Sequence, residues 1–467
     1  MTSEIAPKPL QTWLQRLKHV TGIDRAIGFT VLARSWTAAG GVITVLLIAH
    51  FLSPQEQGYY YTFASLVALQ MIFELGFSFV ILQIAAHERA QLTIYPDGRI
   101  VGDRVPHARL ASILQQAVRW YSVAAILMAA VLIAGGHHFF AGHQQPGVPI
   151  RWQWPWGLVV IASSLTFQMD PVFSFLEGCG KVSEVAHMRL TQATAGSLLC
   201  WLALTTHHGL FAPAFVILGQ AGAGAWFLVR HRRLLLHLLR YRVGGYAISW
   251  AAEVWPFQWR IAASWASGYL ILQLFNPVLF AYRGSVVAGQ MGMSMNIANA
   301  VGAIALSWMT TKAAPFGTLV AQRDFSELDR LFGRTLRQST VILSGGILLV
   351  LGGLSVIGNI LPAFPARILP LSLFALLLLT ILCNHVVVGE AYYLRAHKRE
   401  PLVYFWIVIA IISVAMTVWT GKYWGAAGVT ISYFLVGGPL RLSAATYVFL
   451  KKRKEWHTKV HAEMIQT

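Results

Sequence analysis

The sequence predicts an all-α polytopic membrane protein with about twelve transmembrane helices in two pseudo-symmetric lobes of six. Three observations support this fold class. The chain of 467 residues is 56% hydrophobic and only 12% charged, whereas a soluble domain carries roughly 25% charged residues. The apolar residues gather in blocks of about twenty, the length that crosses a bilayer as a helix. The Lys and Arg residues concentrate in the segments between these blocks.

The apolar blocks predict the membrane spans, which cover residues 28–51, 58–86, 113–136, 156–178, 188–207, 211–230, 255–277, 284–311, 339–361, 370–394, 402–421 and 424–448. We therefore expect a first lobe over 28–230 and a second over 255–448. The remaining segments are a cytoplasmic N-terminal segment (1–27), a linker (231–254) and a basic tail (449–467).

Two of these connecting segments have amphipathic patterns. Leu10, Trp13, Leu14, Leu17 and Val20 recur at helical spacing in the N-terminal segment, which favours either a surface helix or a disordered tail. In the linker, four leucines share one face beside a basic cluster: Leu234, Leu235, Leu238 and Leu239. This second pattern predicts an interfacial helix that joins the two lobes. The connection 87–112 is also long enough for a surface helix.

The distribution of positive charge predicts the orientation. With residue 1 inside, 28 of the 36 Lys and Arg residues fall in or beside inside segments, and only four lie in outside loops: Arg151, Arg283, Arg367 and Lys422. Cytoplasmic loops carry this excess in membrane proteins. We therefore expect both termini to be cytoplasmic. The basic loops would contact anionic membrane lipid, which accounts for the net charge of +18. The charge therefore does not indicate nucleic acid as a partner.

A weak internal repeat supports two related lobes. Ala33-Arg34-Ser35-Trp36 in the first span has a counterpart, Ala262-Ala263-Ser264-Trp265, in the seventh. Each is followed by a hairpin and by a span that opens near a glycine, Gly58 or Gly289. Repeats of this kind are typical of pseudo-symmetric transporters.

Three stretches of sequence resemble a known family. Residues 46–61 read Leu-Leu-Ile-Ala-His-Phe-Leu-Ser-Pro-Gln-Glu-Gln-Gly-Tyr-Tyr-Tyr, and Phe73-Glu74-Leu75-Gly76 follows. Residues 288–293 and 393–401 carry the other two stretches. The chain resembles the bacterial polysaccharide transporters, the O-antigen flippase-like (Wzx-like) branch of the multidrug/oligosaccharidyl-lipid/polysaccharide (MOP) exporter superfamily.

The resemblance implies a V-shaped bundle of two six-helix lobes in the bacterial inner membrane. It also implies movement of an undecaprenyl-pyrophosphate-linked glycan between the leaflets, for lipopolysaccharide or other surface polysaccharide synthesis. A polysaccharide polymerase or export machinery would then be a partner, and no cofactor is expected beyond a coupling ion, H⁺ or Na⁺.

Charged residues inside the spans are the candidate site residues, because each costs roughly 2.5–3.5 kcal/mol to insert. Arg34 and Arg260 lie at similar depths in repeat-related spans, on a shared helical face. Two guanidinium groups suit a pyrophosphate through bidentate hydrogen bonds. The competing interpretation is that both side chains reach the interface by snorkelling.

Two carboxylates are candidates for ion coupling. Glu74 lies in the middle of its span and must pair with an arginine or be protonated. Asp170 precedes Pro171, which predicts a bend or break; there Asp170 either forms a protonatable hinge or caps a half-helix. A structural role remains the alternative for both. The other charged span residues, Glu177, Glu390, Arg119 and Arg441, are expected at solvated helix ends.

Three functions compete with the flippase. A membrane glycosyltransferase or ligase would need catalytic residues in a large outer loop, yet Glu56 is the only carboxylate predicted outside. A cation-coupled multidrug exporter would depend on carboxylates more than on paired arginines. A scaffold role in an export complex has only the basic surface to support it. The sequence therefore favours a transporter over an enzyme.

The predicted topology is testable by cysteine labelling after replacement of the native Cys179, Cys200 and Cys383. Gln144→Cys and Ala366→Cys should react with an impermeant thiol reagent in intact cells, because both positions are predicted outside. Asp103→Cys and Glu327→Cys should react only after permeabilisation. Labelling of Glu327→Cys in intact cells would contradict the orientation with both termini inside.

Overall fold

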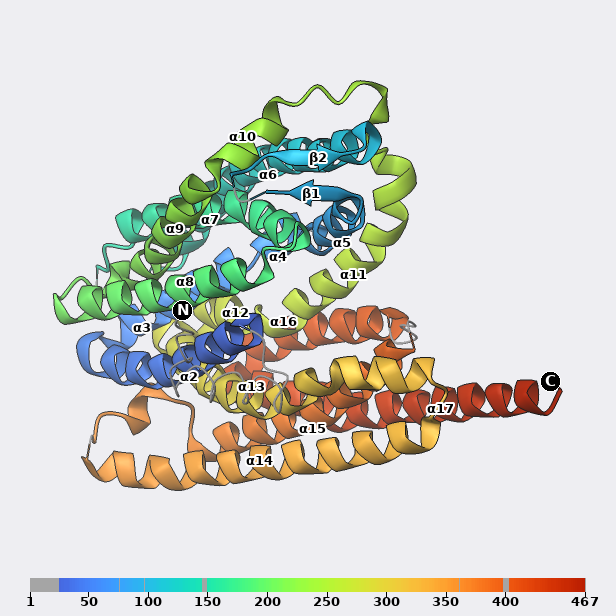
Figure 1. The fold of residues 1–467 in the computed structure, drawn as a ribbon. Coiled ribbons are helices and arrows are strands. Elements are labelled where there is room, and N and C mark those ends of the chain that lie inside the picture. Colours follow the sequence, from blue (N-terminus) through green and yellow to red (C-terminus); the bar gives the residue numbers. More distant parts are fainter. Residues whose placement is uncertain are drawn as a thin grey trace, which may run out of the picture.

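The computed structural model describes residues 25–466 except 75, 96, 145–148, 361 and 398–402. The predicted N-terminal amphipathic segment lies outside this range. The first half comprises α2 (Arg25–Phe51), α3 (Pro54–Val67), α4 (Gln70–Glu74), α5 (Phe77–Arg89), α6 (Arg104–Gly142), α7 (Gln153–Gly178), α8 (Val182–Thr205) and α9 (Ala212–Arg230). Figure 1 shows these helices running roughly side by side in one group.

The second half follows a connecting segment that contains α10 (Arg232–Arg240). It comprises α11 (Trp255–Leu272), α12 (Phe275–Arg283), α13 (Ser285–Ala321), α14 (Phe325–Ile360), α15 (Leu371–Ala396), α16 (Val403–Leu435) and α17 (Arg441–Gln466). Short 3₁₀ or π turns lie at 209–211, 244–246, 250–254, 365–367 and 436–440. The described residues of every predicted span are mostly helical, so the all-α polytopic fold is confirmed.

Several helices in the described part of the chain are long and apolar enough to span a membrane. Seven meet this criterion singly, and the bent pair Pro54–Glu74 and Phe77–Arg89 raises the number to eight. One of the seven, Phe405–His457, contains a reversal at Gly425, which has a φ of 62°. The hydroxyls of Thr420 and Ser432 lie 3.2 Å apart, whereas twelve residues of straight helix would separate them by about 18 Å. This stretch therefore contains the two predicted spans 402–421 and 424–448.

One connection differs from the sequence prediction. In place of a surface helix, residues 87–112 contain an antiparallel hairpin of β1 (Leu92–Ile94) and β2 (Ile100–Gly102). The turn contains Asp97 and Gly98, and Gly98 has a φ of 91°, a conformation that glycine adopts without steric cost. Asp-Gly is a strong hairpin signal, and it decides the structure here. In the predicted linker, residues Arg232–Arg240 form the helix α10, and its place at the membrane interface stays a prediction.

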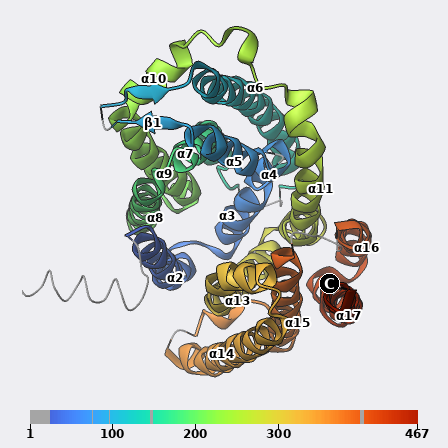
Figure 2. The same ribbon diagram turned by 45° about the vertical axis from the view of Figure 1, so that its right-hand side comes forward.

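Most packing lies within each half of the chain. The first half is built on the contacts of α8 with α2 and α9 and of α7 with α5 and α6, and the second on those of α13 with α14 and α15 and of α11 with α16. Across the two halves, α3 packs against α13 and α12, and α4 packs against α11. Figure 2 shows the first group above this contact and α13, α14 and α15 of the second below it, while α11 runs beside the first group. The lobe boundaries drawn from the sequence stay a prediction.

The contact between α3 and α13 is a close crossing of two backbones. A Cβ on Gly58 would lie 2.0 Å from the Ser285 carbonyl oxygen, and a Cβ on Gly289 would lie 2.9 Å from the Gly58 nitrogen. The buried Gln57 side chain donates to the carbonyls of Gly289 at 2.9 Å and Arg367 at 2.8 Å. Gln57, Gly58 and Gly289 belong to the family-like stretches of the sequence, so the resemblance covers part of the segment that joins the two halves.

The bundle has two ends. We call one the basic end, because α2 begins there with Arg25 and α10 follows α9 there. We call the other the opposite end; the crossing lies there, with the start of α3, the start of α13 and the 365–367 turn. The positive-inside pattern predicts that the basic end is cytoplasmic.

Gly58→Val should destabilise the purified protein, because the added side chain collides with the α13 backbone. Overpacking of this kind typically costs about 1–3 kcal/mol. Gly135→Val in α6 is a matched control, since its Cβ would meet no atom within 4 Å. Thermal unfolding in detergent should show a lower midpoint for Gly58→Val alone. Equal midpoints for the two variants would contradict the close crossing.

Candidate functional site

Arg34 lies in α2 and reaches the other half of the protein. It follows Gly28, the first residue of the candidate membrane span, by six positions, or about 9 Å along the helix axis, which is the depth that the sequence indicates. Its side chain is exposed, and Nη1 donates a hydrogen bond of 3.2 Å to Thr310 Oγ1 on α13. Among the described residues, no carboxylate forms an ion pair with Arg34.

Arg260, the second predicted phosphate ligand, lies on α11. Its side chain lies outside the described part of the structure, so the convergence of the two guanidinium groups stays a prediction. Figure 2 shows α2 and α11 on opposite sides of α3. The two helices therefore flank the segment that links the halves.

Glu74 stands at a break in the second span rather than in the middle of a continuous helix. It is the last residue of α4, Gly76 has a φ of 67°, and α5 begins at Phe77. Helix breaks at membrane depth free backbone polar groups and are tolerated where other groups or water satisfy them. Discontinuous helices of this kind form the binding sites of many transporters. The break therefore strengthens the case for Glu74 as a site residue.

Asp170 does not cap a half-helix, so that prediction was wrong. The helix α7 continues through Pro171 to Gly178. A proline inside a helix removes one backbone hydrogen bond, and the surrounding packing compensates here, since Phe167, Pro171 and Phe173 are all buried. The Asp170 side chain itself is exposed.

The two carboxylates belong to one cluster. The charges that act on Asp170 are those of Glu74 and of Arg189 on α8, and Arg189 also acts on Glu74. Arg189 lies 3.7 Å from Glu177 as well. Beside Glu74, Ser78 Oγ lies 3.1 Å from the Tyr121 hydroxyl. Among the described residues, Arg189 thus forms an ion pair with Glu177 and acts on Glu74 and Asp170 through charge at longer range.

Arg189 is the charged neighbour of Asp170 that sequence reasoning missed. The chain turns between α7 and α8 at Cys179–Lys181, and Asp170 and Arg189 are nearly equally distant from this turn along the sequence. Antiparallel neighbouring helices place such residues at similar depths. This similar spacing was the signal that could have identified the pair.

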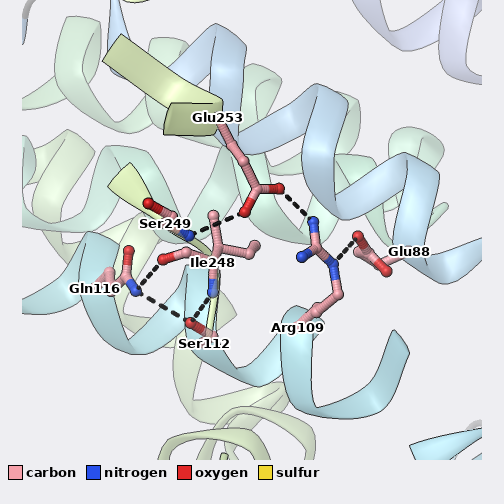
Figure 3. A network of polar contacts seen from close by, with 7 residues as sticks. All are labelled: Glu88, Arg109, Ser112, Gln116, Ile248, Ser249 and Glu253. Carbon is pink, nitrogen blue, oxygen red and sulfur yellow. Dashed lines mark hydrogen bonds and ion pairs between the residues drawn. The ribbon is translucent and has the colours of Figure 1, made fainter. Parts of the chain in front are cut away.

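An ion-pair network ties the linker to the first half at the basic end (Figure 3). Arg109 on α6 donates from Nε to Glu88 at 2.7 Å and from Nη2 to Glu253 at 2.6 Å. Glu88 is buried. The hydrogen bond from Arg109 is the main cause that holds the pKa of Glu253 below its ordinary value, and a hydrogen bond from the Ser249 backbone is the second.

The backbone of the linker joins the same network. The Ile248 N–H donates to Ser112 Oγ at 3.1 Å, and Gln116 Nε2 donates to the Ile248 carbonyl at 3.0 Å. Glu253 Oε1 accepts from the Ser249 N–H at 3.0 Å. All three contacts lie just before α11, so the second half begins from a segment held on α6 (Figure 3).

Glu390 is not at a solvated helix end, so the sequence prediction was wrong for this residue. It is 4% exposed because α15 continues to Ala396 and packs against α17. Its Oε1 accepts from the Thr446 hydroxyl at 2.7 Å, and its Oε2 has no hydrogen-bond partner among the described residues. The second half therefore holds a buried carboxyl group of its own.

Among known proteins, the chain has similar structures but no similar sequences. No protein-family model and no curated protein matches the sequence. The inward-facing conformation of a multidrug resistance MATE family transporter of the MOP superfamily aligns with a TM-score of 0.64 at 11% identity, over 94% of this chain and 99% of that one. The chain has the fold of these transporters.

Two further structures share the fold. An outward-facing conformation of a multidrug resistance MATE family transporter aligns with a TM-score of 0.52 at 10% identity, over 95% of this chain and 96% of that one. The lipid II flippase MurJ in an inward closed conformation aligns with a TM-score of 0.54 at 12% identity, over 94% and 93% of the two chains. The fold is therefore common to multidrug resistance transporters and a lipid II flippase.

A double-mutant cycle tests the cluster around Asp170. Arg189→Ala should destabilise the protein by about 1–3 kcal/mol, because it leaves Glu74 and Asp170 facing each other without their cation. Adding Asp170→Asn should recover much of this loss. The free energy of unfolding, measured by denaturant titration in detergent, gives the coupling. Additive effects of the two substitutions would show that the residues do not interact.

Proposed function

We propose that this protein is a flippase that moves a polyprenyl-pyrophosphate-linked oligosaccharide across the bacterial inner membrane by alternating access. Its product would supply cell-surface polysaccharide such as O-antigen. The fold it shares with MurJ and the MATE transporters supports a transporter, and the resemblance of residues 46–61 supports the glycan-lipid substrate. The proposal involves no covalent step.

The observation that carries the proposal is the state of Arg34. A guanidinium group inside a span, exposed and without a carboxylate partner among the described residues, keeps its full charge for a ligand. Its hydrogen bond to Thr310 places it between the two halves, where transporters of this architecture bind substrate. In this proposal a pyrophosphate replaces Thr310 as the acceptor, and Arg260 supplies the second guanidinium group.

The contact at the opposite end supports a direction of loading. The crossing of α3 and α13 brings the halves together there, and Gln57 adds hydrogen bonds to the second half. The fold also aligns better with the inward-facing MATE transporter than with the outward-facing one, at TM-scores of 0.64 and 0.52. We infer a resting state that loads from the basic end, which the charge distribution assigns to the cytoplasm.

Glu74 and Asp170 are proposed to couple an ion gradient to the return step. Glu74 of α4 and Asp170 of α7 both lie within range of the charge of Arg189, which itself pairs with Glu177. Binding of H⁺ or Na⁺ would relieve the repulsion of the carboxylates and change which acid Arg189 pairs with. Since Glu74 ends α4 at the break, this change acts on the part of α4 that packs against α11.

A cation-coupled multidrug exporter is the second candidate, and this same acidic pair favours it. Organic cations bind to carboxylates, and most of the fold relatives named above are drug transporters. The two candidates differ in the role of Arg34, because a cationic substrate gains nothing from an unpaired guanidinium group. The state of Arg34 is the reason for placing the flippase first.

Deletion of the gene separates the two candidates. A flippase predicts loss of surface glycan and accumulation of a lipid-linked oligosaccharide in the inner leaflet, measured by extraction and by protection from an impermeant glycosidase in right-side-out vesicles. An exporter predicts normal glycan and raised sensitivity to cationic drugs. A partner polymerase, if there is one, would remain active on glycan-lipid supplied from outside.

Arg34→Ala should abolish or strongly reduce glycan export while the protein still inserts. Loss of one buried charge contact to the headgroup typically costs about 2–5 kcal/mol. Arg34→Lys should rescue partly, because an ammonium lacks the planar fork of donors. Arg260→Ala should match Arg34→Ala if both bind the headgroup. Surface glycan relative to protein level is the measurement.

Arg119→Ala is the matched control, since Arg119 is an exposed arginine in the third span. It should export normally. Normal export from Arg34→Ala at wild-type abundance, or full rescue by lysine, would show that Arg34 only snorkels and would remove the pyrophosphate site.

A further inference from the structure

Two adjoining pockets open at the basic end, away from the contact between the halves. The first, of about 550 Å³, lies between α2, α8 and α9. Its walls are mainly apolar and include Gly28, Phe29 and Leu32 of α2 and Trp226 and Phe227 of α9. A slot of this size and lining suits a hydrocarbon chain.

The second pocket, of about 670 Å³, lies between the β1–β2 hairpin, α9 and α10. Its walls are polar and mainly basic, with Lys181, Arg230, His231, Arg232 and Arg233. The two pockets share Glu184, Trp226 and Arg230 as wall residues. Together they form one groove, which we call the α9 groove, with an apolar part and a basic part.

The acidic residues of the α9 groove are already paired. Glu184 accepts from Lys181 Nζ at 2.9 Å and lies 2.8 Å from His231 Nε2. Asp97 pairs with Arg99 at 2.6 Å. Arg230, Arg232 and Arg233 form no ion pair with any described residue and are exposed. Three guanidinium groups are therefore free to bind an anion.

The basic part of the groove has a fixed framework. The helix α10 is anchored by Leu234, Leu235 and Leu238, all buried, so its arginines project from the other face. The hairpin turn lies directly against α10, since a Cβ on Gly98 would be 2.9 Å from the Leu234 nitrogen. At the junction of the two parts, the Arg230 guanidinium lies 6.0 Å from the centre of the Trp226 ring, an arrangement common at membrane interfaces.

We propose that the α9 groove binds an anionic phospholipid of the cytoplasmic leaflet. The phosphate lies against Arg230, Arg232 and Arg233, and an acyl chain lies in the slot beside Phe29 and Leu32. The order of the two parts matches that of a lipid at the cytoplasmic interface, with the apolar slot among spans and the basic pocket beside the linker. The proposal depends on the predicted orientation and not on the transported substrate, since every wall residue belongs to the first half, the hairpin or α10.

Native mass spectrometry of the full-length protein in a mild detergent tests the proposal. Phosphatidylglycerol, phosphatidylcholine and glycerol phosphate are titrated in turn. One phosphatidylglycerol should bind at least tenfold more tightly than phosphatidylcholine, and glycerol phosphate should bind far more weakly because it lacks the acyl chains. Equal binding of the two lipids, or equal binding of glycerol phosphate and phosphatidylglycerol, would overturn it.

Matched variants locate the site. Arg232→Gln with Arg233→Gln should weaken phosphatidylglycerol binding by about 25-fold, at roughly fivefold for each arginine near an anionic lipid surface. Arg240→Gln with Arg242→Gln removes the same charge from exposed positions outside the groove and should change binding less than twofold. Equal losses from the two pairs would show that only the surface potential matters.

A third variant tests the apolar slot. Gly28→Phe should fill it without a clash at Cβ, since nothing lies within 4 Å there, and it should weaken phosphatidylglycerol binding with no effect on glycerol phosphate. Thermal unfolding in detergent without added lipid confirms that each variant is folded. Unchanged lipid binding in Gly28→Phe would exclude the slot. Failure of these tests leaves the flippase proposal standing, because none of them measures export.

Discussion

Backbone contact between α3 and α13 is the constraint that the rest of the architecture depends on. Two glycines allow it: a side chain on Gly58 would collide with the Ser285 carbonyl, and one on Gly289 would meet the Gly58 nitrogen. Gln57 then uses its buried amide to bind two carbonyls of the second half. These contacts join the two halves at the opposite end, and a hydrophobic core shared by both halves packs beside them, with Tyr59 of α3 against Phe280 of α12. A protein that alternates between two faces must break this contact once in each cycle.

The intramembrane charges are arranged in two groups with different partners. Arg34 faces Thr310 across the halves and has no acid among its described neighbours, whereas Glu74 and Asp170 share Arg189 within the first half. Each charge inserted into the membrane costs a few kcal/mol. Both groups are therefore candidates for a functional role. The first group suits an anionic headgroup, and the second suits a cation that comes and goes. The linker network of Arg109 with Glu88 and Glu253 then connects the first half to the start of α11.

Hydropathy and charge were sufficient to predict the fold, because a bilayer allows few alternatives to helices of spanning length. They did not predict local deviations from regular helix. The break at Gly76 depends on one glycine with positive φ, while Pro171, the stronger sequence signal, is accommodated by buried aromatic packing. Residues 92–102 form a hairpin around the turn at Asp97 and Gly98. The length of the connection 87–112, on which the prediction of a surface helix rested, does not reveal this turn. Glu390 was misplaced because the end of α15 is set by packing on α17. To predict which residues lie near Asp170, one must know which helices are neighbours. Of these residues, only Arg189 could have been found by counting from the turn between α7 and α8.

Distances between the halves test alternating access most directly. Spin labels at Gln144 and Ala366 report on the opposite end, and labels at Asp103 and Gln322 report on the basic end; all four positions are exposed. Measured by double electron–electron resonance in nanodiscs, with and without lipid-linked oligosaccharide, the first distance should lengthen as the second shortens, since the α3–α13 contact opens at one end while the other end closes. Two distances that stay unchanged with substrate, or that change in the same direction, would contradict the account.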